Sequence, residues 1–236
     1  MVTPVPIITA VENAMVDRLK RGLGQMVRQV STYGGEFDDD GLADVVRNLP
    51  AAWVTFGGVR KTSAVDARRK SWKAEGTFIV MVGAYSVRSE AASRQGGARM
   101  GEVGTNMLIW AVRRLLAQQD LSLPIQEFAP GAVRTLFNTK LQRDAFSVFA
   151  LEFHTAWIEH ALAGHAFPQP VDPATVVASD PTCGLDALFA LYKGQLDPAT
   201  PDLTAVELNT FVNGAPESGL PLAQDIVTLP PSQESK

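Results

Sequence analysis

Several features of secreted and membrane proteins are missing from this 236-residue sequence. Its one cysteine, Cys183, cannot form an intramolecular disulfide, so a secreted scaffold held by disulfides is excluded. No run approaches the roughly eighteen uncharged apolar residues of a membrane span. The N-terminal residues lack a basic region followed by a long apolar run, so we expect no signal peptide. We therefore expect a protein made and used in a reducing cytoplasm.

Residues that carry catalysis or bind metals are also scarce. The three histidines, His154, His160 and His165, match no zinc-ligand spacing, and Cys183 has no cysteine partner. The glycines of residues 96–104 fit neither phosphate-binding glycine motif, which favours a flexible connector over a phosphate loop. The sequence has neither a G-x-S-x-G motif nor a distinctive carboxylate pair. We predict no enzyme, no metal site and no cofactor.

Residues 51–88 are the feature around which the chain is organised. A strand signal over residues 51–56 stops at Gly57-Gly58, and a second one covers residues 75–87. Between them lie about fifteen residues, 59–73, that include Trp72 and a single acid, Asp66. A loop of this length is typical of binding segments. Its basic residues are Arg60, Lys61, Arg68, Arg69, Lys70 and Lys73.

Hydrophobic periodicity predicts the other elements. We expect helices over residues 4–23 and 97–119, the second with a broad apolar face that includes Met107 and Trp110 and with Arg113 and Arg114 turned outward. Further predictions are a strand over residues 25–32, a short helix over 42–48 capped by the acids of 38–40, two extended pieces turned at 129–131, and a strand over 145–157. A cation site at 38–40 is the weaker alternative, because spaced oxygens and a distal Glu are lacking. This order predicts an α+β fold, with helices packed on one face of a mostly antiparallel sheet that carries a long β-hairpin.

The character of the chain changes near residue 161, where prolines begin to separate short apolar islands. We predict a core domain over residues 1–160 and an extended, acidic, Pro-rich C-terminal arm over 161–236. Residues 59–99 carry nine basic and three acidic side chains, whereas residues 160–236 carry two lysines and nine acids. The two segments could pair within one molecule or between neighbours; our hypothesis is contact between subunits.

Four segments together resemble the Mu-like phage tail terminator family: residues 49–58 (LPAAWVTFGG), 78–82 (FIVMV), 108–116 (LIWAVRRLL) and 146–153 (FSVFALEF). With the N-terminal helix, the likeness covers about residues 5–160. It implies a curved sheet and a hexameric ring that caps the head-proximal end of the tail tube, stops tube polymerisation and docks to neck or connector proteins. The implied locations are the virion tail and, during assembly, the host cytoplasm.

Three functions remain after these observations: a tail terminator, a neck or tail-completion protein of the same particle, and a nucleic-acid-binding module that uses the basic loop. The net charge of −4 disfavours the third. Trp72 could stack on a base or anchor a protein contact. We favour contact with neighbouring subunits or the tube, with genomic DNA in the lumen as a secondary partner. The predicted contact residues are Arg60, Lys61, Arg68, Arg69, Lys70, Trp72 and Lys73.

Overall fold

The computed structural model describes residues 3–35, 48–86, 94–95, 103–141, 144–177, 180–182, 184–197, 205–210 and 223–228. The chain divides into two units, Met1–Leu196 and Asp197–Lys236. Residues 161–196, which the sequence assigns to the arm, lie in the first unit together with two short helices, η3 (Pro173–Thr175) and α5 (Ala187–Leu191).

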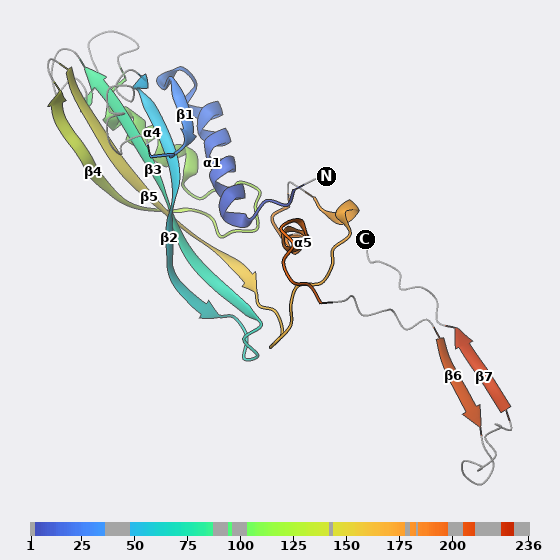
Figure 1. Cartoon of the computed structure of the whole chain (residues 1–236). Coiled ribbons are helices and arrows are strands. Elements are labelled where there is room, and N and C mark those ends of the chain that lie inside the picture. The colour runs from blue at the N-terminus through green and yellow to red at the C-terminus, as the bar shows by residue number, and fades with distance from the viewer. Residues whose placement is uncertain are drawn as a thin grey trace. The chain divides into compact units, whose positions relative to one another are not determined.

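The first unit is built on a five-stranded sheet with the order β1-β2-β3-β5-β4 (Figure 1). The β1–β2 pair is parallel and every other pair is antiparallel. The predicted α+β fold with a mostly antiparallel, curved sheet is confirmed. The strands are β1 (Gln29–Thr32), β2 (Ala51–Ala64), β3 (Ser71–Ser86), β4 (Ala129–Leu141) and β5 (Asp144–His160).

Helix α1 (Ile7–Leu23) begins after Pro6 and ends before Gly24, whose φ of 50° suits the end of a helix. Val11, Met15, Leu19 and Leu23 repeat every four residues and are buried. Gly22 lies inside the helix. A Cβ atom there would come within 2.5 Å of Cδ2 of Leu115, so Gly22 allows close approach of the next helix.

Helix α4 (Thr105–Leu116) begins later than predicted, because Gly104 before it is extended; residues 97–102 of the predicted helix lie outside the described residues. Leu108, Val112 and Leu116 join α1 in one core against the sheet. Trp110, expected on the apolar face, is 68% exposed, and Met107 is also exposed. Arg113, expected to point outward, is partly buried and donates to the carbonyl oxygen of Gly131 at 3.0 Å.

Two strand predictions need correction at their ends. The predicted strand over 25–32 is regular only in β1, because η1 (Gly24–Met26) is a short 3₁₀ helix. The predicted turn at 129–131 is instead the start of β4, where a bulge between Pro130 and Val133 bends the strand. Most of the predicted helix over 42–48, with its acidic cap, lies outside the described residues.

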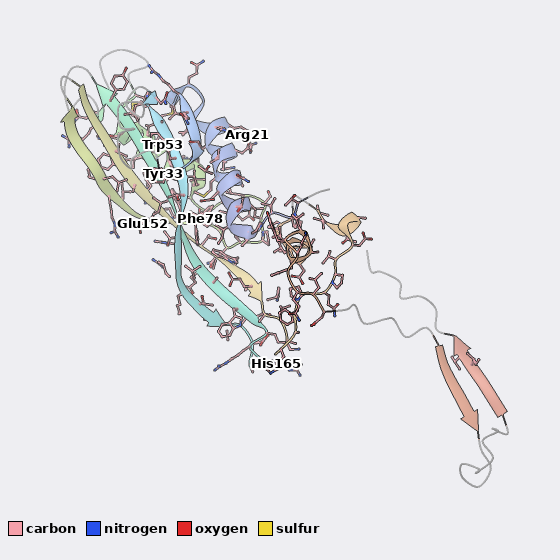
Figure 2. All side chains as sticks on the ribbon, in the orientation of Figure 1. Arg21, Tyr33, Trp53, Phe78, Glu152 and His165 are labelled. Atoms are coloured by element: carbon pink, nitrogen blue, oxygen red, sulfur yellow. The ribbon has the colours of Figure 1, made fainter. Side chains whose placement is uncertain are left out.

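Both faces of the sheet are apolar at its β1 end. Val54, Val80 and Leu151 lie opposite one another on the helix-covered face. The next row, Trp53, Met81 and Ala150, forms a second buried cluster on the other face. Figure 2 labels Trp53 and its neighbour Tyr33 from this second cluster, and Phe78 from the first. This half of the sheet is therefore held by packing on both sides.

The second unit contains a two-stranded antiparallel sheet of β6 (Ala205–Thr210) and β7 (Ala223–Thr228). The register runs from Ala205 opposite Thr228 to Thr210 opposite Ala223. Ile226 and Val227 are both exposed. Because successive residues of a strand point to opposite faces, each face of this hairpin exposes an apolar side chain.

Candidate functional site

The basic segment predicted as a long loop is mostly paired strand. Beyond Gly57-Gly58, β2 and β3 continue to pair as far as Ala64 opposite Trp72. The glycines do not end the strand, because Gly58, with a φ of 107°, accommodates a register shift between Phe56 and Gly58. The loop is therefore only residues 65–70. We call residues 57–76 the ribbon.

Strand β5 supports the ribbon along one side. Trp72 pairs with Glu159, and Ser71 pairs with His160 at the end of β5. A Cβ atom at Gly76 would lie 2.5 Å from Cζ3 of Trp157, so this glycine makes room for the indole ring. Figure 1 shows β2, β3 and β5 extending together past the helices. The ribbon is thus a three-stranded projection of the sheet.

The single acid of the basic segment organises its turn. The carboxylate of Asp66 accepts a hydrogen bond from the backbone N–H of Lys70 at 3.1 Å. The carbonyl oxygen of Asp66 accepts one from the N–H of Arg69 at 3.2 Å, and Arg69 has a φ of 53°. This geometry holds three exposed basic residues, Arg68, Arg69 and Lys70, at the tip of the ribbon.

The predicted contact residues do not form one surface. Lys61 lies opposite Glu75, and Lys73 lies opposite Ser63, which places both lysines on one face of the ribbon. Trp72 is half-buried and belongs to the other face. Arg60 is exposed at a second register shift, between Val59 and Lys61. The structure therefore separates them into four places: the lysine face, Trp72 on the opposite face, Arg60 at a bulge, and the basic tip.

Exposed apolar residues lie among these cations and were not predicted. Val65, at the turn, is 56% exposed, and Val59 on β2 is also exposed. Ile158, directly opposite Lys73 on β5, and Leu162 just beyond β5 are exposed as well. Residues 59–65 (VRKTSAV) do not alternate between apolar and polar side chains, so periodicity offered no signal for these positions. A surface of exposed cations and apolar side chains is suited to contact with another protein.

Two of the three histidines, His154 and His160, take part in hydrogen bonds within the sheet. His154 Nδ1 lies 2.9 Å from the hydroxyl oxygen of Thr77, and His160 Nδ1 lies 3.2 Å from that of Ser71. Glu152 lies 4.0 Å from His154 Nε2 and 3.3 Å from the guanidinium of Arg134. Among the described residues, no three His, Cys, Asp or Glu side chains gather as metal ligands would.

A groove of about 680 Å³ lies beside the end of β5. Its lining includes the apolar side chains of Ile7, Trp157 and Leu185 together with Glu159 and Asp186. The indole N–H of Trp157 donates to Glu159 Oε1 at 2.8 Å, which fixes one wall. Among the described residues that line the groove, no arrangement of groups suggests a reaction.

Residues 7–158 match the family model described as Bacteriophage Mu, Gp37. The chain belongs to this family. The "Mu-like prophage FluMu protein gp37" of Haemophilus influenzae is 23% identical over 148 residues, which cover 63% of this chain and 69% of that protein. The chain is therefore a Mu-like phage protein.

The part matched to the Gp37 family begins at α1 and runs nearly to the end of β5, so it includes the whole ribbon. Residues 159–236, with the β6–β7 hairpin, lie beyond it. In the described part of this Gp37-family chain, we find no helix with the length and apolar character of a membrane span.

Proposed function

We propose that this Gp37-family chain is the tail terminator of a Mu-like phage. Its copies form a closed ring, a hexamer, that caps the head-proximal end of the tail tube, stops tube polymerisation and docks to the neck or connector. The protein acts in the virion tail and is present in the host cytoplasm during assembly. The observation that carries the proposal is the ribbon, a supported projection with exposed cations and apolar side chains within the family-matched region.

The ribbon suits a ring because of how such rings close. Subunits related by rotation contact each other through two different complementary surfaces. A β-projection whose strands already pair with one another presents one such surface with little loss of conformational entropy on binding. The ribbon supplies this surface, and its tip contacts the neighbouring subunit or the tube.

Protein contact fits the ribbon better than nucleic-acid binding does. Lys61 lies opposite Glu75, so part of the basic charge on that face is already offset. Val59 and Val65 add exposed apolar area that phosphate groups would not use. The basic tip can still face DNA that passes through the lumen, as a secondary partner.

The test is co-assembly of the purified chain with the tail tube protein of the same phage, with tube lengths measured in negative-stain images. We expect short tubes with a ring at one end. Arg60→Glu/Lys61→Glu should restore long tubes, whereas Lys20→Glu/Arg114→Glu, the same charge change on exposed helix positions, should not. Unchanged tube lengths together with binding to connector protein would instead identify a neck protein.

A further inference from the structure

One edge of the ribbon is open. β1 pairs with β2 only as far as Val54. Beyond that point, none of the described strands pairs with the outer edge of residues 55–64. The backbone N–H and C=O groups along such an edge can pair with another strand. Native proteins commonly protect edges of this kind or use them for binding.

The charge of this edge selects its partner. Residues 59–73 carry six basic side chains and one acid, a formal net charge of +5. Arg60 and Lys61 lie on the edge strand itself. Two copies of this edge would therefore repel each other, while an acidic strand would be attracted.

The second unit supplies an acidic strand pair of suitable length. A two-stranded sheet on its own is only marginally stable, because it cannot bury an apolar face. Ile226 and Val227 are both exposed, one on each face of this hairpin. Residues 197–236 carry six acids and one lysine, a formal net charge of −5, opposite to that of the ribbon.

We propose that the β6–β7 hairpin of one copy adds to the open β2 edge of a second copy, so that one sheet continues across two subunits. The six-residue strands are shorter than the ten-residue open stretch at 55–64, within which β2 shifts register twice. The inference rests on the ring of the proposed function and names the two surfaces that close it. The opposite charges of the ribbon and the hairpin select this partner, and backbone hydrogen bonds between the two strands stabilise the contact.

The other long open edge, that of β4, is less suited to the addition of a strand. Pro130 has no N–H to donate, and register shifts interrupt the strand between Pro130 and Val133 and between Thr135 and Phe137. β2 also shifts register twice, between Phe56 and Gly58 and between Val59 and Lys61, but it contains no proline and its pairing from Lys61 to Ala64 is regular. The absence of proline and the larger basic charge beside it therefore favour the β2 edge over β4.

The first experiment is zero-length carbodiimide cross-linking of the full chain, using an equal mixture of ¹⁴N- and ¹⁵N-labelled protein. We expect links from Lys61 or Lys73 to Glu207 or Asp225 in peptide pairs that carry mixed labels. Links between these residues only within one isotope would show that the hairpin folds back on its own copy. That result, links from the hairpin to Lys140 of β4, or an absence of links would each overturn the inference.

The second experiment reverses charge on the hairpin. Glu207→Lys/Asp225→Lys should abolish the oligomer in native mass spectrometry, and combination with Arg60→Glu/Lys61→Glu should restore it. Glu217→Lys/Glu234→Lys makes the same charge change outside β6 and β7 and should leave the oligomer intact. An intact oligomer in the Glu207→Lys/Asp225→Lys variant contradicts the inference.

The two proposals fail separately. Mixed-label links without any effect on tube length would refute the terminator role and leave the strand addition standing. Capped, shortened tubes without mixed-label links would refute the strand addition and leave the terminator role standing.

Discussion

The β2–β3 pair has two halves that differ in burial: the half near β1 is packed on both faces, whereas the ribbon has exposed positions. In the half near β1, successive rows such as Trp53–Met81 and Val54–Val80 are buried on opposite faces of the sheet. In the ribbon, the row Lys61–Glu75 is polar, with Lys61 exposed and Glu75 partly buried. Pairing continues through both halves, so the buried half holds the exposed half in position. Packing therefore specifies where the ribbon lies, and its free surface is available for contacts.

Truncation of a side chain in the buried half should lower the free energy of unfolding the most. Phe78 is fully buried, with its ring centroid 5.2 Å from that of Phe56 and 6.1 Å from that of Phe128. Phe78→Ala should lower the free energy of unfolding by about 3–5 kcal/mol. Val65→Ala, at the exposed turn, should change it by less than about 0.5 kcal/mol. Urea unfolding followed by circular dichroism measures the free energy of unfolding of both variants. Equal losses of stability would show that the two halves do not differ in packing.

The junction between the halves should show an intermediate effect. Gly76→Ala would force its new methyl group against the indole of Trp157 and should cost about 1–3 kcal/mol. Gly164→Ala is the matched control, because no atom lies within 4 Å of a Cβ there. Thermal unfolding distinguishes the two variants. An equally stable Gly76→Ala protein would mean that Trp157 does not pack over the ribbon as described.

The turn at the end of the ribbon should contribute less. Asp66→Ala removes the acceptor for the Lys70 N–H, at a cost of about 1 kcal/mol. Asp66→Asn keeps an oxygen acceptor and should retain most of that stability. We expect the backbone amide of Lys70 to exchange its hydrogen faster in Asp66→Ala than in the wild type, and not in Asp66→Asn. Equal exchange rates in both variants would argue against a turn organised by this side chain.

Charge reversal on the ribbon should have the smallest effect on folding and a large one on assembly. Arg60→Glu/Lys61→Glu should cost about 0.5 kcal/mol in the monomer, mainly because residue 61 then faces Glu75 with like charge. The same variant should lose the oligomer. Sedimentation velocity measures the loss of the oligomer, and urea unfolding measures the change in monomer stability. An oligomer as stable as that of the wild type would show that the ribbon does not contact a neighbouring subunit.

Periodicity predicted the buried elements well because burial imposes it. The spacing of Val11, Met15 and Leu19 predicted α1, and the apolar run at 145–157 lies within β5. Trp110 shows the limit of this reasoning, since an apolar side chain at a helical position can lie on the open side of a helix that is covered only in part.

The ribbon was harder to predict because glycine has two roles in strands. Gly57-Gly58 was interpreted as the end of a strand but forms a bulge, since β3 continues to pair past it. The alternation of apolar and polar side chains over residues 72–75 (WKAE) was the available signal. The second apolar cluster, around Trp53 and Met81, depends on strand register, which sequence spacing alone does not specify.

The mass of the purified full chain in solution distinguishes a closed ring from a monomer or an open assembly. Light scattering and native mass spectrometry should give one closed species at about six times 25.4 kDa, unchanged as protein concentration rises. Arg60→Glu/Lys61→Glu should reduce that mass to the monomer. A wild-type chain that remains monomeric at every concentration, or that forms an open series of growing masses, would contradict the ring.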